Sequence, residues 1–365
     1  MEAKRARRSL RGKVTFVVQL AVIAALAIYI VHDFNVKEFA SALKHVSAWS
    51  LVPIALSEVF YYTFHALAFW ALCRKKFNLT VVEAIGSSMM AWLVDIILPS
   101  AFVEGDVMRA LFLKTKADWA SSLSYALFFR LLISSTLVLF LLLTSLLAVN
   151  VLVLHPLLAL AYVSMIGLWI ILAVVLSLTL FKPTAMKGPL LKLLRRVVPS
   201  RAFERLERDL EAFLARVEDA SRSLRENVAW LLVAVAALMA KWTSGIFTSY
   251  FALRAVGVEV NFFAVAPGYT LLTLFSLASI GVPFMLGSID SALVILYTML
   301  GVPKEAALLA TFIGRSFTIL VSMLLIYPLG TYYIKKTFSA YNLNDVKRML
   351  RRISEEYGVK LPLLG

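Results

Sequence analysis

Residues 81–113 read VVEAIGSSMMAWLVDIILPSAFVEGDVMRALFL, an apolar stretch that is broken in its middle by Pro99 and Gly105. Basic residues flank it on both sides, three at positions 74–76 and two lysines at 114 and 116. Basic flanks mark the cytoplasmic side of a membrane, so both ends of the stretch are predicted to lie on that side. Such a segment cannot cross once. It is predicted to form a helical hairpin that turns near Pro99 and is either buried in protein or lines a water-filled cavity.

The composition of the whole chain agrees with a membrane location. Of its 365 residues, 61% are hydrophobic and 16% charged, and the mean hydropathy is +0.84. A soluble domain is closer to half apolar and a quarter charged, and a single cysteine excludes a disulfide scaffold. Most of the net charge of +15 gathers in residues 1–13, 182–226 and 335–365, beside apolar spans. This distribution favours orientation in a membrane and argues against nucleic-acid binding.

Six further stretches are apolar over the roughly 20 residues that a bilayer crossing needs. They are residues 14–32, 48–73, 119–148, 155–181, 228–254 and 304–330. The alternation of their loops predicts a multi-pass protein of the plasma membrane with both termini in the cytoplasm. By the same alternation, residues 262–300 form a second hairpin, which turns near Pro283 and opens to the outside.

The two hairpin regions resemble each other, which predicts an internal duplication. Similar residues follow in the same order in each copy: Pro99, Gly105, Asp106 and Arg130 in the first, and Pro283, Gly287, Asp290 and Arg315 in the second. The helices before them also align at an offset of 181 residues. The predicted fold is therefore an all-α integral membrane bundle with two inverted repeats, each containing a re-entrant hairpin, as in many transporters.

Five regions follow from this organisation. A short interfacial helix is predicted over residues 33–47, and an amphipathic cytoplasmic helix over residues 201–226. The regions are a basic N-terminus with the first span and interfacial helix (1–47), the first repeat with a connecting span (48–181), a cytoplasmic helical segment (182–227), the inverted second repeat (228–334) and a basic cytoplasmic tail (335–365).

Ionisable side chains within the apolar stretches are candidates for the functional site, because each is costly to bury in a bilayer. The candidates are Arg109, Arg130, Lys241, Arg315, Asp106, Asp290, Glu104, Asp95 and Glu58. One interpretation is structural, with ion pairs Asp106–Arg130 and Asp290–Arg315 holding each hairpin to the next helix. The other is that the cations receive an anionic headgroup, and both interpretations can hold together.

Motifs for catalysis are absent from the sequence. It has no phosphate-binding loop, no zinc-ligand spacing and no nucleophile elbow, so no catalytic residue, metal or cofactor is predicted. An enzyme remains an alternative: a membrane-embedded transferase acting on a lipid phosphate, in which Glu104, Asp106 and Asp95 could hold a metal. A third alternative is a non-catalytic membrane partner of a glycosyltransferase.

The segment Asp95-Ile-Ile-Leu-Pro99, followed by Gly105-Asp106-Val-Met-Arg109-Ala110, resembles a signature of the lysylphosphatidylglycerol synthase transmembrane-region family. Val282-Pro283-Phe-Met-Leu-Gly287-Ser-Ile-Asp290 resembles a second signature. The resemblance implies a flippase-like domain, here without the soluble synthase that larger members carry. The family usually has Asn at the position of Asp95 and Glu at that of Asp290.

The resemblance thus implies a lipid flippase. It would move a phospholipid, aminoacylated or not, or a polyprenyl-linked lipid between leaflets. Its partners would be membrane lipids and a separate lipid-modifying enzyme, and the sequence leaves a homo-oligomer open.

Overall fold

The computed structural model describes residues 46–97, 103–147, 156–197, 200–266 and 287–339, with Lys37, Ser41, Leu43, Lys44 and Leu272. Within these residues every regular element is helical. The elements are α3 (Ala48–Phe77), α4 (Val81–Ile97), α5 (Val103–Lys114), α6 (Trp119–Leu147), α8 (Pro156–Phe181), α9 (Lys187–Val197), α10 (Ser200–Arg225), α11 (Val228–Ala255), α12 (Phe262–Val265), α14 (Ser288–Met299), α15 (Lys304–Val321) and α16 (Tyr327–Ser339), with a 3₁₀ turn at Pro183–Met186 and a π-helical turn at Ser322–Ile326. The predicted span 14–32, most of the interfacial helix 33–47, and both predicted hairpin turns at Pro99 and Pro283 lie outside the described residues.

Four helices of the described chain are long and apolar enough to cross a membrane. They are α3, α6, α11 and a continuous helix, Lys304–Ser339, that joins α15 to α16 through the π-helical turn. Four of the six predicted spans are confirmed in this way, and the protein is an all-α, multi-pass membrane protein. Helix α8 has nearly the bounds predicted for a fifth, residues 155–181.

The last membrane helix extends beyond its predicted end at residue 330 and runs to Ser339. Gly330 lies against α4, where an added Cβ would come within 2.9 Å of Leu93 Cβ and of the Met89 carbonyl oxygen. This contact needs a residue without a side chain, so Gly330 serves packing and does not end the helix. The predicted start of the tail at residue 335 therefore falls inside α16.

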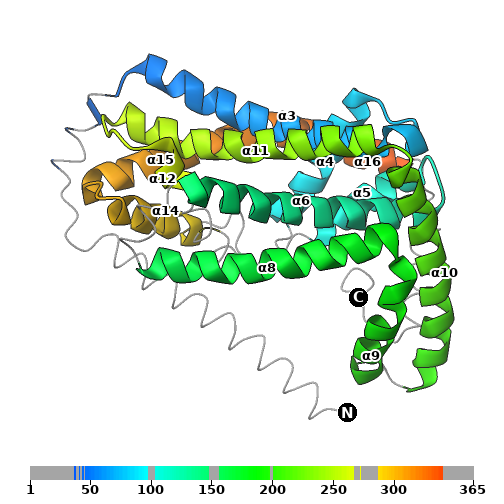
Figure 1. Ribbon diagram of the computed structural model, residues 1–365. Helices are drawn as coiled ribbons and strands as arrows, with labels where there is room; N and C mark the ends of the chain where they lie inside the picture. Colours follow the sequence, from blue (N-terminus) through cyan, green and yellow to red (C-terminus); the bar gives the residue numbers. More distant parts are fainter. Residues whose placement is uncertain are drawn as a thin grey trace, which may run out of the picture.

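The long helices lie side by side, with α9 and α10 crossing one end of the bundle (Figure 1). At that end Lys75, close to the end of α3, hydrogen-bonds to Asn227, just before α11. The Ser221 hydroxyl of α10 donates to the Thr179 carbonyl of α8 at 2.6 Å. The loops predicted to share the cytoplasmic side are thus gathered at one end of the bundle. The predicted helix over residues 201–226 is confirmed as α10, with Leu214 among its buried residues.

Helices α3 and α11 form an antiparallel pair through the core. Trp70, late in α3, contacts Trp230, early in α11, with ring centroids 5.5 Å apart. Midway along both helices, Tyr61 meets Trp242 at 6.2 Å. Figure 1 shows α4 and α5 toward the α10 end of this pair, and α12 and α14 toward the opposite end.

Candidate functional site

Lys241 is a buried cation in the middle of α11, and 2% of its surface is exposed. Aromatic rings surround its ammonium: Nζ lies 3.6 Å from the ring centroid of Trp242, 4.8 Å from that of Tyr61 and 5.9 Å from that of Trp92. Desolvated cation–π contacts stabilise such a charge by about 2 kcal/mol. Among the described residues, no carboxylate forms an ion pair with Lys241. The contacts of Nζ within the described residues are therefore with aromatic ring faces.

Arg109 of α5 is 3% exposed and is close enough to Lys241 to interact with it electrostatically. Its Nη1 donates to Asp106 Oδ1 at 2.5 Å, and its Nη2 lies 3.1 Å from Nε2 of His65. A guanidinium can only donate hydrogen bonds, so Nε2 of His65 accepts and the ring proton of the neutral imidazole is on Nδ1. The ring of His65 packs against Trp92 at 5.5 Å and links Arg109 to the rings around Lys241.

Asp106 is the anion of this cluster and contacts two cations. Besides Arg109, its Oδ2 lies 3.7 Å from Nε of Arg130 on α6. The predicted ion pair Asp106–Arg130 is therefore confirmed. The side chain of Arg130 is 38% exposed, which makes it the most accessible cation of the group. We call Lys241, Arg109, Arg130, Asp106, His65 and Trp92 the central basic cluster.

Three polar atoms of the central basic cluster are buried and have no hydrogen-bond partner in the described part of the chain. They are Nδ1 of His65, Nε of Arg109 and Nε1 of Trp92. Given the tautomer of His65, all three are N–H donors. Burying a donor without an acceptor costs about 1–3 kcal/mol. The cluster thus has an excess of positive charge and of donors, and an anion with several acceptor oxygens would complement both.

Asp95 of α4 lies apart from the cations and binds backbone. Its Oδ1 accepts a 2.8 Å hydrogen bond from the Gly105 N–H near the start of α5. A Cβ on Gly105 would lie 2.3 Å from the same carboxylate, so this close approach requires glycine. The bond ties α4 to α5 near the predicted turn. The side chain of Glu104 lies outside the described residues.

The second predicted ion pair is also confirmed. Nε of Arg315 on α15 donates to Asp290 Oδ1 at 2.8 Å. Asp290 Oδ2 accepts the backbone N–H of Gly287 at 2.7 Å and so caps α14. Gly287 has φ of 83°, a left-handed conformation that glycine adopts without strain. Glu58 of α3 lies nearby and contacts Thr318 of α15.

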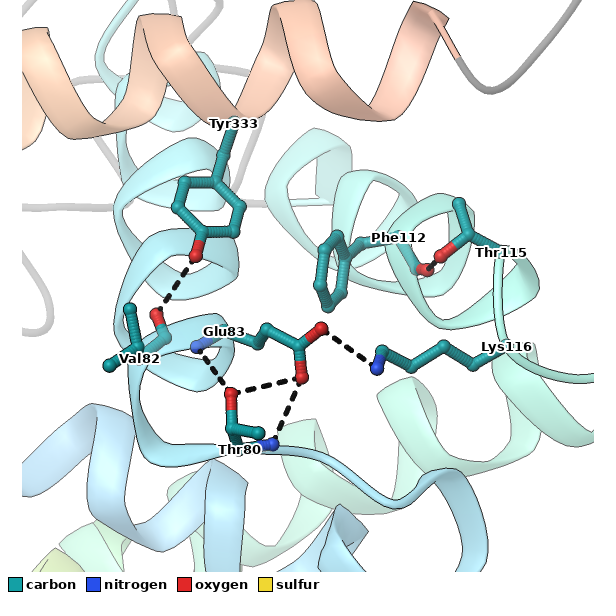
Figure 2. Close-up of polar contacts among 7 residues, drawn as sticks. All are labelled: Thr80, Val82, Glu83, Phe112, Thr115, Lys116 and Tyr333. Carbon is teal, nitrogen blue, oxygen red and sulfur yellow. Dashed lines mark hydrogen bonds and ion pairs between the residues drawn. The ribbon is translucent and has the colours of Figure 1, made fainter.

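Figure 2 shows the contacts that connect the start of α4 with the end of α5. Glu83, in the first turn of α4, forms a 2.8 Å ion pair with Lys116, just after α5. Its other oxygen accepts from the N–H and hydroxyl of Thr80, both at 3.0 Å, while the Glu83 N–H donates to the Thr80 hydroxyl, which makes a capping box. Partial burial alone would raise the pKa of Glu83, but the hydrogen bonds from Lys116 and Thr80 outweigh it and hold this pKa below its usual range.

Two of the three carboxylates considered for a metal, Asp95 and Asp106, are bound to other groups. The described residues hold no group of three or more potential metal ligands. Asp106 forms ion pairs with two arginines, and Asp95 accepts a hydrogen bond from a backbone N–H. In both residues, carboxylate oxygens that could bind a metal already have other partners.

The structure therefore brings together three of the predicted cations, Arg109, Arg130 and Lys241, and places Arg315 in a second group. Sequence reasoning missed Trp92 and Trp242, because tryptophan in an apolar helix is more often a packing residue. The i, i+3 spacing of Asp106 and Arg109 was the signal for their ion pair.

The fold and these buried charges define a class, that of polytopic α-helical membrane proteins with a polar centre. The family follows from comparison with known proteins: the lysylphosphatidylglycerol synthase TM region matches residues 16–326, and the chain belongs to this family. Comparisons with curated proteins and with solved structures give no match. Family membership makes this a membrane protein that interacts with lipids.

Proposed function

We propose that the protein moves a phospholipid, aminoacylated or not, or a polyprenyl-linked lipid between the two leaflets, with the central basic cluster receiving the phosphate of the headgroup. The observation that carries the proposal is the buried excess of cations and unpaired N–H donors around His65, Arg109 and Lys241. A phosphodiester supplies both the negative charge and the acceptor oxygens that this cluster lacks. Arg130, the most exposed member, is the first contact of an entering headgroup.

An inverted duplication is part of the proposal. Its support is the antiparallel α3–α11 pair, in which Tyr61 contacts Trp242, the residue 181 positions later. A residue meets its own equivalent only near a two-fold axis. The pairs Asp106–Arg130 and Asp290–Arg315 recur at matching places, and the α4–α5 pair and α14 lie toward opposite ends of the bundle (Figure 1).

A re-entrant first hairpin is likewise proposed. Helix α5 has 12 residues and is about 18 Å long, which is too short to cross a hydrocarbon core of about 30 Å. The contacts Asp95–Gly105 at one end and Glu83–Lys116 at the other align α4 and α5 as an antiparallel pair. Both ends of the pair then open on the same side of the membrane.

Reconstitution into liposomes tests the translocase. A fluorescent phospholipid in the inner leaflet becomes accessible to a membrane-impermeant quencher only after translocation. We expect wild-type protein to increase this rate, and Arg130→Ala or Arg315→Ala to abolish the increase. Arg254→Ala is the matched control, since Arg254 pairs with Glu259 at the end of α11, outside the cluster. Wild-type rates in both Arg130→Ala and Arg315→Ala would refute the assignment of these arginines to the transport site.

The same liposomes distinguish a transferase. Mass spectrometry of the lipids after incubation should show unchanged masses if the protein only moves them. A new lipid mass that depends on the protein and is lost in Asp106→Asn would replace the translocase by an enzyme. Copurification of a lipid-modifying enzyme would be compatible with a translocase, provided that the isolated protein still moves lipid.

We further propose that the protein lies in the plasma membrane with the α10 end in the cytoplasm. The only native cysteine, Cys73, is fully buried and gives no labelling background. Lys187→Cys at the α10 end and Glu259→Cys at the other end introduce accessible thiols, because these side chains are 39% and 85% exposed. An impermeant maleimide added to intact cells should label only Glu259→Cys, and labelling of Lys187→Cys alone would reverse the orientation.

A further inference from the structure

A polar ladder joins α3 to the last membrane helix. Glu58 and Tyr62 lie one turn apart on α3 and face Thr318 and Ser322, one turn apart on the other helix. Thr318 Oγ1 is 2.7 Å from Glu58 Oε1, and Ser322 Oγ is 2.9 Å from the Tyr62 hydroxyl. Glu58 and Tyr62 are 7% and 4% exposed, so the ladder is inside the protein.

The hydrogen bonds of this ladder are compatible with either an ionised or a protonated Glu58. Ser322 donates its hydroxyl hydrogen to the Thr318 carbonyl at 2.6 Å, so the Tyr62 hydroxyl must donate to Ser322. Thr318 has one hydroxyl hydrogen but two acceptors, Glu58 Oε1 and the Gly314 carbonyl at 3.1 Å. Thr318 can donate to an ionised Glu58. Alternatively, a protonated Glu58 donates to Thr318, and Thr318 then donates to Gly314. The two states differ only in the positions of hydrogen atoms: the protonated state supplies a hydrogen to both contacts of Thr318, and the ionised state supplies one only to the contact with Glu58.

The charged groups around Glu58 show which ion pair its ionisation would affect. Within the described residues no cation lies within ion-pair distance of Glu58. From α15, Arg315 attracts it electrostatically, and from α11 the neutral Thr248 faces it. Arg315 lies three residues before Thr318, on the same side of α15, and its Nε is bound to Asp290 of α14. A negative charge on Glu58 would therefore compete with Asp290 for Arg315.

We propose that Glu58 is the binding site of a proton that drives lipid movement, and that its ionised form draws Arg315 away from Asp290. The inference rests on the proposed translocase. Protonated Glu58 is neutral and leaves the Arg315–Asp290 pair intact. When its proton passes to water, the carboxylate attracts Arg315 and weakens the hold on Asp290, which also caps α14 through Gly287. The π-helical turn Ser322–Ile326 begins at the ladder and provides a wider turn in which the helix can adjust.

Infrared spectroscopy tests the proton site without any transport. A protonated carboxyl buried in protein has a C=O stretching band separate from those of carboxylates and amides. We expect this band in the wild type near neutral pH and its loss in Glu58→Gln. Thr318→Val removes the hydrogen-bond partner and should shift the same band, which gives a second reading if Glu58→Gln does not fold. A spectrum unchanged by either substitution would overturn the proposal.

A pH gradient across liposomes tests the coupling. Exchange of one proton per lipid lets a gradient of one pH unit support a lipid asymmetry of about tenfold, since both correspond to about 1.4 kcal/mol. We expect wild-type protein in initially symmetric liposomes to build such an asymmetry. If it moves lipid but leaves the leaflets equal, or responds instead to a sodium gradient at equal pH, the proton proposal fails and the translocase stands. If it moves no lipid under any condition, the translocase itself fails, whereas the infrared band still reports on Glu58.

Discussion

Substitution of Gly86 by alanine should weaken the contact between α4 and the last membrane helix. A Cβ at this position would lie 2.0–2.3 Å from three ring carbons of Tyr333, a residue that is 5% exposed. The ring would have to move by more than 1 Å in a packed environment. Overpacking of this kind costs about 3 kcal/mol at the upper end of its range, whereas replacing glycine in a helix gains about 1 kcal/mol. The net loss should be about 2 kcal/mol.

Gly314 provides the matched control within another helix. A Cβ there would meet Ala252 Cβ at 3.5 Å, an ordinary contact, so Gly314→Ala should leave stability unchanged or raise it by up to about 1 kcal/mol. The assay is thermal unfolding of both variants in detergent, repeated for Gly86→Ala in a Tyr333→Ala background, where the clash is absent. Equal Tm values for the two glycine variants, or no relief in the Tyr333→Ala background, would refute this packing argument.

Three other substitutions should change stability for different reasons. Asp106→Asn leaves the buried guanidinium of Arg109 without its carboxylate and should cost about 3 kcal/mol, which thermal unfolding measures against the wild type. Arg74→Ala removes a guanidinium that lies 4.0 Å from the ring centroid of Trp230 and should lower the free energy of unfolding by about 1 kcal/mol in the same assay. Arg74→Lys keeps the positive charge, so if it lowers the stability as much as Arg74→Ala does, a cation–π origin is excluded. The lowered pKa of Glu83 means that its ion pair stabilises the fold above the unfolded-state pKa of about 4.3 and is lost as the pH falls through the folded-state value. The Tm difference between wild type and Glu83→Gln should therefore close below about pH 4, and a constant difference would contradict this origin.

The sequence predicted the features that the bilayer imposes directly. A span must be apolar over a fixed length, so hydropathy alone located α3, α6 and α11 to within a few residues. The ion pairs Asp106–Arg130 and Asp290–Arg315 were also predictable, because a buried charge needs a partner and few were available.

Features that depend on three-dimensional packing were not predictable. Asp95 bonds to a backbone N–H at Gly105, and a backbone donor leaves no mark in the sequence. The rings around Lys241 come from α3, α4 and α11, which are far apart in the chain. The π-helical turn at Ser322 has no periodicity of its own over five residues. Each of these is set by which helices meet, and an amphipathic pattern does not specify the partner.

The aromatic rings around Lys241 also give the centre of the protein an intrinsic fluorescence signal. Trp242 has its ring centroid 3.6 Å from Nζ of Lys241, and indole emission is sensitive to the electric field across the ring. An anion that binds beside Lys241, or a movement of α4 that displaces Trp92, would change the colour and intensity of the fluorescence. The native chain therefore contains its own reporter for events at the central basic cluster, readable without attaching a dye.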